Sequence, residues 1–241
     1  MSAVAKPTRF RAKMAASMYF ISWVGSIAGL IFYGPVLKNS NYLTGGASDK
    51  HIILGAMLEV ICGFANIGCA VVLYPIVKRA NESLALAYVA LRTLESAVIL
   101  VGVLPMLAVV SLRHMSGNPA GLNDLATSMV AFHNWSFILG PNIVCGVNTF
   151  VLAYALYKSG LVAKFVPVLG LIGGTLTFIS GSLQMFGGLE QNSPGTAALS
   201  IPVFAWEISL ASFLFFKGFK AVAYEKLVAK DVEADRVLVT A

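Results

Sequence analysis

Four charged side chains interrupt the apolar stretches of this 241-residue sequence: Glu59, Arg92, Glu95 and Glu207. Acidic groups that are shielded from water can exchange protons or bind cations, and a nearby arginine can pair with them. Arg92 and Glu95 are three residues apart, so they share one helix face and can pair directly. We expect Arg92 to pair with Glu95 or Glu207, and Arg113, in a loop, to be solvated. Because three carboxylates share one guanidinium, at least one glutamate should be neutral, or a cation or water should be bound.

Uncharged polar residues accompany these charges. The segment "AFHNWSFILGPN", residues 131–142, holds a histidine and two asparagines, and Pro141 should kink its helix and free backbone carbonyls. Asn66 continues the helix face of Glu59. The candidate binding cluster is therefore Glu59, Arg92, Glu95, Asn142 and Glu207, with a pocket wall of His133, Asn134 and Asn66. The alternative for the charged residues is a structural network that only fixes the register of the helices. The alternative for His133 is an interfacial histidine that is hydrogen-bonded to a neighbour and has no further role.

The elements that must position these side chains are membrane helices. The chain is 58% hydrophobic and 12% charged, with a mean hydropathy of +0.80, whereas soluble domains carry about 25% charged residues. A bilayer core of about 30 Å requires roughly 20 apolar residues in a helix. Six stretches qualify, at about 15–36, 52–77, 84–112, 128–157, 162–187 and 197–217. The sequence therefore predicts an all-α integral membrane bundle of six transmembrane helices.

The distribution of basic residues predicts the orientation of the bundle. Most Lys and Arg lie in the N-terminal segment, the loop after the second stretch, the turn after the fourth and the tail. The positive-inside rule then places both the N and C termini in the cytoplasm, which an even number of spans also requires. The predicted parts are a basic segment 1–14, a membrane domain 15–219 and a cytoplasmic tail 220–241. A helix on the membrane surface, a short solvated helix and a disordered end all fit the tail.

Small residues mark the expected contacts between helices. Helices in lipid associate through close packing of glycine, serine and threonine. The fifth stretch has Gly170 and Gly174 four residues apart, and the first stretch has Gly25 and Gly29. These rows are expected to be packing seams, with glycines that line a conduit or let a helix bend as the alternative.

Several functions lack their sequence signatures. The three cysteines lie in apolar runs and form no CxxC pattern, and no basic cluster alternates with exposed aromatics as in nucleic-acid binding. There is no HExxH, GxSxG or Walker motif. The histidines His51, His114 and His133 all fall toward the outer face, where Glu59 could approach them. They leave an intramembrane metal-dependent hydrolase open as an alternative, but we predict no metal site, no haem, no other cofactor and no nucleic-acid partner.

Three segments together resemble a known family: "ALAYVALRTLESAV", "HNWSFILGPN" and "IPVFAWEISLASFLFFKGF". They are similar to a bacterial family of multi-spanning membrane proteins catalogued as domain of unknown function 4386. The shared elements include the Arg-x-x-Glu of Arg92 and Glu95, and a late proline and Trp-Glu at Pro202, Trp206 and Glu207. The resemblance implies a bacterial inner (plasma) membrane location. It supplies no activity and therefore no catalytic residues.

These observations favour a membrane protein, not an enzyme, whose polar core binds or passes a small solute, proton or cation. Its expected partners are the lipid bilayer and that small ligand, with oligomers and partner subunits left open. One alternative is an accessory or assembly subunit whose polar cluster is only structural. This alternative predicts no cavity and fully paired glutamates.

Overall fold

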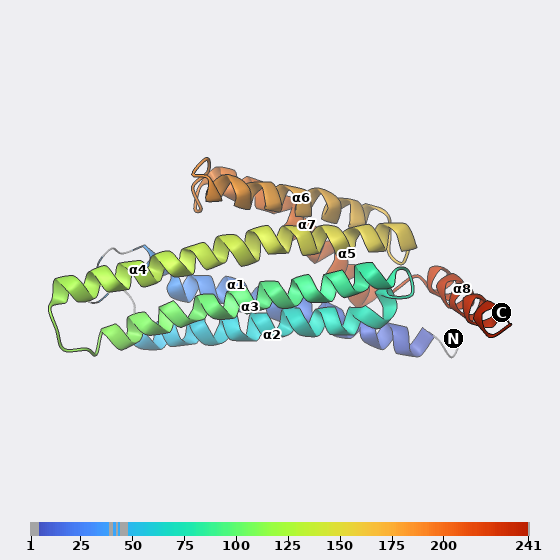
Figure 1. Ribbon diagram of the computed structural model, residues 1–241, viewed down its shortest axis with the longest axis horizontal. Coiled ribbons are helices and arrows are strands. Elements are labelled where there is room, and N and C mark those ends of the chain that lie inside the picture. Colours follow the sequence, from blue (N-terminus) through green and yellow to red (C-terminus); the bar gives the residue numbers. More distant parts are fainter. Residues whose placement is uncertain (1–4, 39–40, 42, 44–47, 241) are drawn as a thin grey trace.

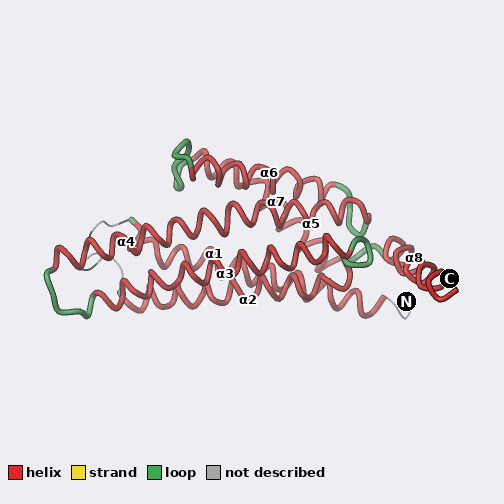
Figure 2. Tube along the Cα trace, in the orientation of Figure 1, coloured by secondary structure: helices red, strands yellow, loops and turns green. Residues whose placement is uncertain are grey.

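The computed structural model describes residues 5–38, 41, 43 and 48–240, with side chains described from Thr8 to Glu233 within these ranges. Every regular element of these residues is helical (Figure 2). The bounds are α1 Ala5–Leu37, α2 Asp49–Val77, α3 Glu82–Leu112, α4 Pro119–Phe137, the π-helix η1 Ile138–Val144, α5 Cys145–Ser159, α6 Phe165–Met185, α7 Pro194–Phe216 and α8 Ala221–Thr240.

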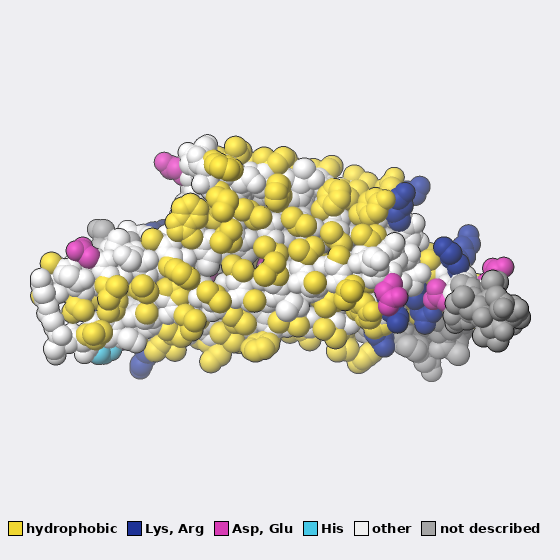
Figure 3. Space-filling view, in the orientation of Figure 1, with side chains coloured by type: hydrophobic (Ala, Val, Ile, Leu, Met, Phe, Trp, Pro, Cys, Tyr) yellow, Lys and Arg dark blue, Asp and Glu magenta, His cyan; other side chains and the backbone are white. Residues whose placement is uncertain are grey.

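Six helical segments of the described chain are long and apolar enough to cross a membrane, as predicted. The fourth segment runs without interruption through α4, η1 and α5, from Pro119 to Ser159. The outward faces of these helices carry large hydrophobic side chains, including Val24, Phe64 and Leu104, each more than 60% exposed. In Figure 3 hydrophobic side chains extend along the visible face, while many Lys and Arg gather at the end near α8. Because soluble proteins rarely expose such continuous apolar surfaces, these faces are suited to lipid.

The spans form a closed ring. Along the chain α1 packs on α2, α2 on α3, and α3 on the α4–η1–α5 segment, which in turn packs on α6. Helix α7 packs on both α6 and α1 and so closes the ring. The first turns of α1 lie at the same end of the bundle as α8 (Figure 1), as an even number of spans requires. We call this the tail end and the opposite end the far end; that the tail end faces the cytoplasm stays a prediction.

The structure corrects the start of the fourth span. The helix begins at Pro119, nine residues earlier than the predicted 128. Asn118 caps it, since its side chain accepts a hydrogen bond from the Ala120 amide at 3.1 Å. Asparagine before a proline at the first helical position is a helix start signal, so "NPAG" belongs to the helix. In the tail, α8 agrees with the helical alternatives.

The structure also corrects the expectation for Arg113. Its side chain is only 9% exposed, and Nη1 bonds to Asp49 Oδ1 at 2.9 Å. Asp49 is the first residue of α2, so this ion pair ties the far end of α3 to the far end of α2. Arg113 was expected to be solvated because it follows the last apolar residue of its span, and this prediction was wrong.

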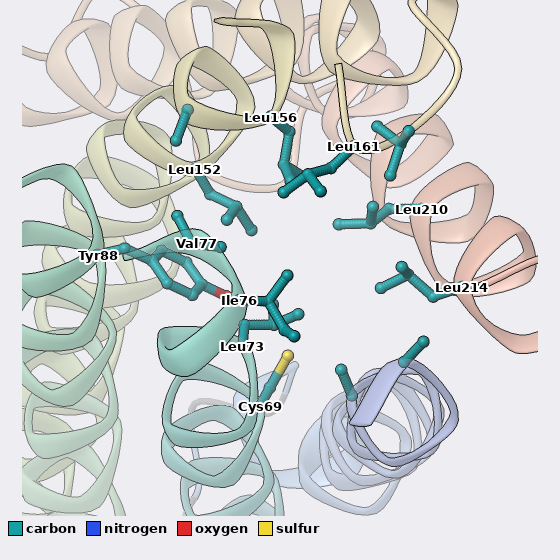
Figure 4. Close-up of a cluster of buried hydrophobic side chains, with 14 of the residues drawn as sticks. Cys69, Leu73, Ile76, Val77, Tyr88, Leu152, Leu156, Leu161, Leu210 and Leu214 are labelled. Carbon is teal, nitrogen blue, oxygen red and sulfur yellow. The ribbon is translucent and has the colours of Figure 1, made fainter. Parts of the chain in front are cut away.

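Two apolar clusters close the two ends of the bundle. The tail-end cluster draws on α1, α2, α3, α5, α6, α7 and α8, and includes Leu73, Ile76, Tyr88, Leu152, Leu156, Leu161, Leu210 and Leu214 (Figure 4). The far-end cluster comes from α1 to α4 and includes Tyr33, Val36, Ile52, Val103, Met106, Val109 and Val130. The described members of the far-end cluster include none from α6 or α7. The polar residues of the spans lie between these clusters.

The glycine seams are packing contacts, as expected. A Cβ at Gly174 would lie 2.6 Å from the Gly146 carbonyl oxygen and 2.8 Å from the Phe150 nitrogen, both backbone atoms of α5. A Cβ at Gly25 would lie 2.7 Å from the Leu58 carbonyl oxygen of α2. Backbone at this distance cannot move aside as a flexible side chain can, so these glycines allow the helices to touch.

We expect Gly174→Ala to destabilise the protein, because its methyl group forces α5 and α6 apart. Overpacking of this kind typically lowers the free energy of unfolding by about 1–3 kcal/mol. Unfolding in mixed micelles measures the change. Gly34→Ala is the control, since a Cβ there meets no described atom within 4 Å and alanine favours helix. Equal stability of the two variants would contradict the seam.

Candidate functional site

A cavity of about 240 Å³ lies in the ring, between the two apolar clusters. Every span contributes to its wall: α1 through Ser22, Trp23 and Ser26; α2 through Cys62 and Asn66; α3 through Arg92, Glu95 and Ile99; the fourth span through Phe137, Pro141, Asn142 and Cys145; α6 through Thr177; and α7 through Ser200, Val203, Phe204 and Glu207. Polar side chains that would be costly against lipid thus face one shared cavity.

Arg92 is the centre of the charged network on this wall. Its Nη1 bonds to Glu95 Oε2 at 2.9 Å, and its Nη2 lies 3.5 Å from Glu207 Oε1. The predicted pairing is confirmed, and it involves both glutamates. Asn148 Nδ2 also donates to Glu95 Oε2, and the guanidinium lies over the Tyr19 ring at 5.7 Å. Arg92 and Glu95 are 3% and 4% exposed, so Glu95 is a fully buried and well-paired carboxylate.

Glu207 differs from Glu95 in both exposure and pairing. Its side chain is 17% exposed, and its contact with Arg92 is the longer of the two. The Trp23 indole Nε1 donates a hydrogen bond to Glu207 Oε2 at 2.8 Å, which links α1 to α7. The two carboxylates share one guanidinium, and Glu207 is the more loosely held. Of the two carboxylates, Glu207 is therefore the more exposed one and has the longer contact with Arg92.

Pro141 explains the polar wall on the fourth span. A proline has no amide hydrogen, so an α-helical bond to the carbonyl four residues earlier, Phe137, cannot form. The helix widens here into the π-helix η1, and Asn142 Nδ2 donates to the Phe137 oxygen at 3.3 Å. The expectation that Pro141 frees a carbonyl is confirmed, and the neighbouring asparagine satisfies it. π-Helical turns within α-helices often occur at functional sites.

Of the two asparagines predicted for the pocket wall, Asn66 lines this cavity and Asn134 does not. Asn66 accepts a hydrogen bond from Ser22 Oγ at 2.8 Å on its Oδ1, which joins α2 to α1 on the cavity wall. Asn134 is half-buried. It is not among the described lining residues of this cavity or of a smaller cavity beside it. Asn66 thus joins the larger cavity, and Asn134 does not.

Glu59 and His133 lie in a separate, smaller cavity of about 20 Å³. Glu59 precedes Asn66 by seven residues, which is about 10 Å along a helix, in the direction of the far end. The predicted cluster is therefore divided between two cavities. The larger one is lined by Arg92, Glu95, Asn142 and Glu207, and the smaller one is lined by Glu59. Whether either cavity binds a ligand stays a prediction.

Three wall or network residues were not singled out as site candidates from the sequence. Trp23 and Asn148 bond to the two glutamates, and Thr177 Oγ1 lines the cavity with no hydrogen-bond partner in the described part of the chain. Asn148 gave a usable signal, because it is an asparagine on the same apolar span as Asn142. Trp23 and Thr177 gave none, since tryptophan is common in membrane helices and Thr177 fits a packing row.

The histidines do not gather into a metal site. His51 approaches Ser48 Oγ at 3.1 Å, His114 pairs with Asp49 at 2.8 Å, and His133 bonds to the Gly102 carbonyl. Among the described residues no group of three or more His, Cys, Asp or Glu could hold a metal ion. The ligand set of the metal-dependent hydrolase is therefore not assembled in this part of the chain.

One family model matches the chain over residues 14–218, and its description is Domain of unknown function (DUF4386). The match covers the six spans and confirms the resemblance noted from the sequence. Neither the curated proteins nor the solved structures contain a significant match.

Proposed function

Since the chain belongs to the family of unknown function DUF4386, whose description assigns no activity, we propose its function from the cavity. The protein is a polytopic membrane protein that binds or passes a small cation or cationic solute between its six spans, without catalysis. We also propose that it resides in a bacterial inner membrane with both termini in the cytoplasm. One observation carries the proposal: Glu207, whose side chain is 17% exposed and whose contact with Arg92 is the longer of the two, lines a cavity of about 240 Å³.

Charge selects a cation over an anion. The wall carries the carboxylates of Glu95 and Glu207 but one guanidinium, Arg92. Arg92 Nη1 and Glu95 Oε2 are already bonded, so a positive ligand beside Glu207 restores balance. Carboxylate and hydroxyl oxygens are suitable ligands for hard cations, and Ser26, Ser200 and Thr177 bring hydroxyl groups to the same wall.

The accessory-subunit hypothesis fits these features less well. It requires glutamates that are fully paired and a core without a cavity. Instead, Glu59 Oε2 has no hydrogen-bond partner among the described residues, and a cavity lies beside Glu207. A purely structural network would gain nothing from either feature, since a buried oxygen without a hydrogen bond and a cavity each lower stability.

Cation titrations of the protein in lipid nanodiscs test the proposal. The panel is Na⁺, K⁺, Mg²⁺, Ca²⁺, ammonium and small primary amines at constant ionic strength. At a concentration of 100 Kd the bound cation should add about 2.7 kcal/mol to the stability of the wild type. Glu207→Gln should lose this stabilisation, because the amide keeps the shape and removes the charge. Flux in proteoliposomes then separates binding from passage.

The matched control is Glu190→Gln, which removes an exposed carboxylate in the loop between α6 and α7. It should respond to cations as the wild type does. If no member of the panel stabilises the wild type more than Glu207→Gln, the proposed function is wrong.

A further inference from the structure

The smaller cavity shares a wall with the larger one. Its lining is Ser26, Glu59, Cys62, Ile99, His133, Ser136, Phe137 and Pro141. Five of these residues, Ser26, Cys62, Ile99, Phe137 and Pro141, also line the larger cavity. Its volume of about 20 Å³ exceeds the roughly 10–15 Å³ that one water molecule requires. The water-sized compartment therefore lies directly beside the cavity of Glu207.

Glu59 lines this compartment and forms no ion pair with any residue that the structure describes. It is 8% exposed, and its Oε2 has no hydrogen-bond partner in the described ranges. The hydroxyl of Tyr33 on α1 lies near this carboxyl group, but it does not reach hydrogen-bonding distance and angle with any described residue, and Tyr33 is fully buried. A carboxylate ion in such surroundings is strongly disfavoured, whereas a protonated carboxyl group is not. Glu59 is thus placed to hold a proton, unlike the ion-paired Glu95.

His133 faces the same compartment with a fixed tautomer. Its Nδ1 lies 2.9 Å from the Gly102 carbonyl oxygen of α3. Because a carbonyl only accepts hydrogen bonds, Nδ1 carries the hydrogen, and Nε2 of the neutral ring is a proton acceptor. The ring also meets the Tyr33 ring edge to face, at 5.2 Å and 82°. Ser136 donates to the His133 carbonyl at 2.7 Å, so the histidine is held on both its ring and its backbone.

We propose that Glu59 and His133 form a proton-exchange site on the far side of the cation cavity. A proton leaves the Glu59 carboxyl group for a water molecule in the compartment, and that water passes a proton to His133 Nε2. The result is a carboxylate beside an imidazolium, and the reverse transfer restores two neutral groups. The site deepens the proposed function, since protonation one wall away from Glu207 would change the field that a cation meets.

Side chains from α1, α2, α3 and the fourth span surround Glu59. The titratable groups that face it are Tyr33 from α1, Cys62 from its own helix α2 and His133 from α4. Helix α3 contributes Ile99 to the lining and the Gly102 carbonyl to His133. The charges of Arg92 and Glu95 lie on the wall of the larger cavity and are paired with each other.

Infrared difference spectroscopy of the protein in nanodiscs tests the proton site directly. The wild type should show the carbonyl band of a protonated carboxyl group that disappears as pH rises. Glu59→Gln should abolish this band, and Glu190→Gln should leave it unchanged. Glu59→Asp should move the band without removing it, which keeps the test valid if Glu59→Gln folds poorly. A band that persists in Glu59→Gln, or that never changes with pH, overturns the proposal.

His133→Asn isolates the histidine. The asparagine amide can still donate to the Gly102 carbonyl, but it offers no basic nitrogen in place of Nε2. Hydrogen–deuterium exchange of the Glu59 carboxyl band should then slow by roughly 100-fold, the low end of what a positioned proton acceptor provides. An unchanged exchange rate would remove His133 from the site and refute the proposal. Cation binding by Glu59→Gln, measured separately, shows whether the function proposed for Glu207 stands without the proton site.

Discussion

Replacing Arg92 by leucine should lower the free energy of unfolding by about 3–5 kcal/mol, the typical result of removing one partner of a buried ion pair. Arg92 is 3% exposed and bonds to Glu95, which is 4% exposed. Without the guanidinium, the described partners that remain are the Asn148 amide for Glu95 and the Trp23 indole for Glu207. Unfolding of the purified protein in mixed micelles measures the loss.

Arg9→Leu is the matched control. Arg9 is exposed in the first turns of α1, so its replacement should change stability by less than about 0.5 kcal/mol, as is usual for surface sites. Arg113 is unsuitable as a control because it is bonded to Asp49. Equal stability of Arg92→Leu and Arg9→Leu would refute the buried network.

A second substitution tests whether the loss comes from the stranded carboxylate. In Arg92→Leu/Glu95→Gln the buried charge is removed together with its partner, so much of the lost stability should return. The double-mutant cycle gives the coupling between the two side chains. If the double variant is as unstable as the sum of the single variants, Arg92 acts through its packing on Tyr19 and not through Glu95.

The sequence predicted the spans because their signal is local. A run of roughly 20 apolar residues is sufficient to identify a membrane helix, and each of the six runs is a helix here. The pairing of Arg92 with Glu95 was predictable for the same reason, since three residues along a helix fix their common face. The start of α4 was missed because the span was bounded by its apolar run, although asparagine followed by proline also begins helices, as Asn118 and Pro119 do here.

The division of the polar residues into two cavities was not predictable from the sequence. Glu59 and Asn66 share a helix face, but which neighbour covers each depends on how α1 and the fourth span cross α2. Asn134 and His133 are adjacent in sequence, yet their burial differs because one helix position turns by about 100° to the next. The Arg113 side chain was wrongly predicted to be solvated, because its partner, Asp49, lies at the start of a different helix and the sequence does not show that the two meet.

Cysteine labelling should show that the larger cavity takes up water from the far end. The tail-end cluster includes residues of α6 and α7, whereas the described far-end cluster comes from α1 to α4. The α7 side of the cavity, where Ser200 and Phe204 lie, is therefore not covered by that far-end cluster. In a variant with Cys62, Cys69 and Cys145 replaced by alanine, Ser200→Cys should react with a charged, membrane-impermeant thiol reagent that is added from the far-end side.

Two control positions on the same helix make this experiment decisive. Ala211→Cys lies in the tail-end cluster at 0% exposure and should not react. Ile201→Cys is next to Ser200 but is 65% exposed on the apolar surface, where lipid excludes water, so its thiol should not ionise and should not react. Reaction at Ile201→Cys would mean that this surface is wet and not lipid-covered. Protection of Ser200→Cys, or its reaction only from the tail-end side, would contradict far-end access, because a charged reagent reaches the thiol only where water does.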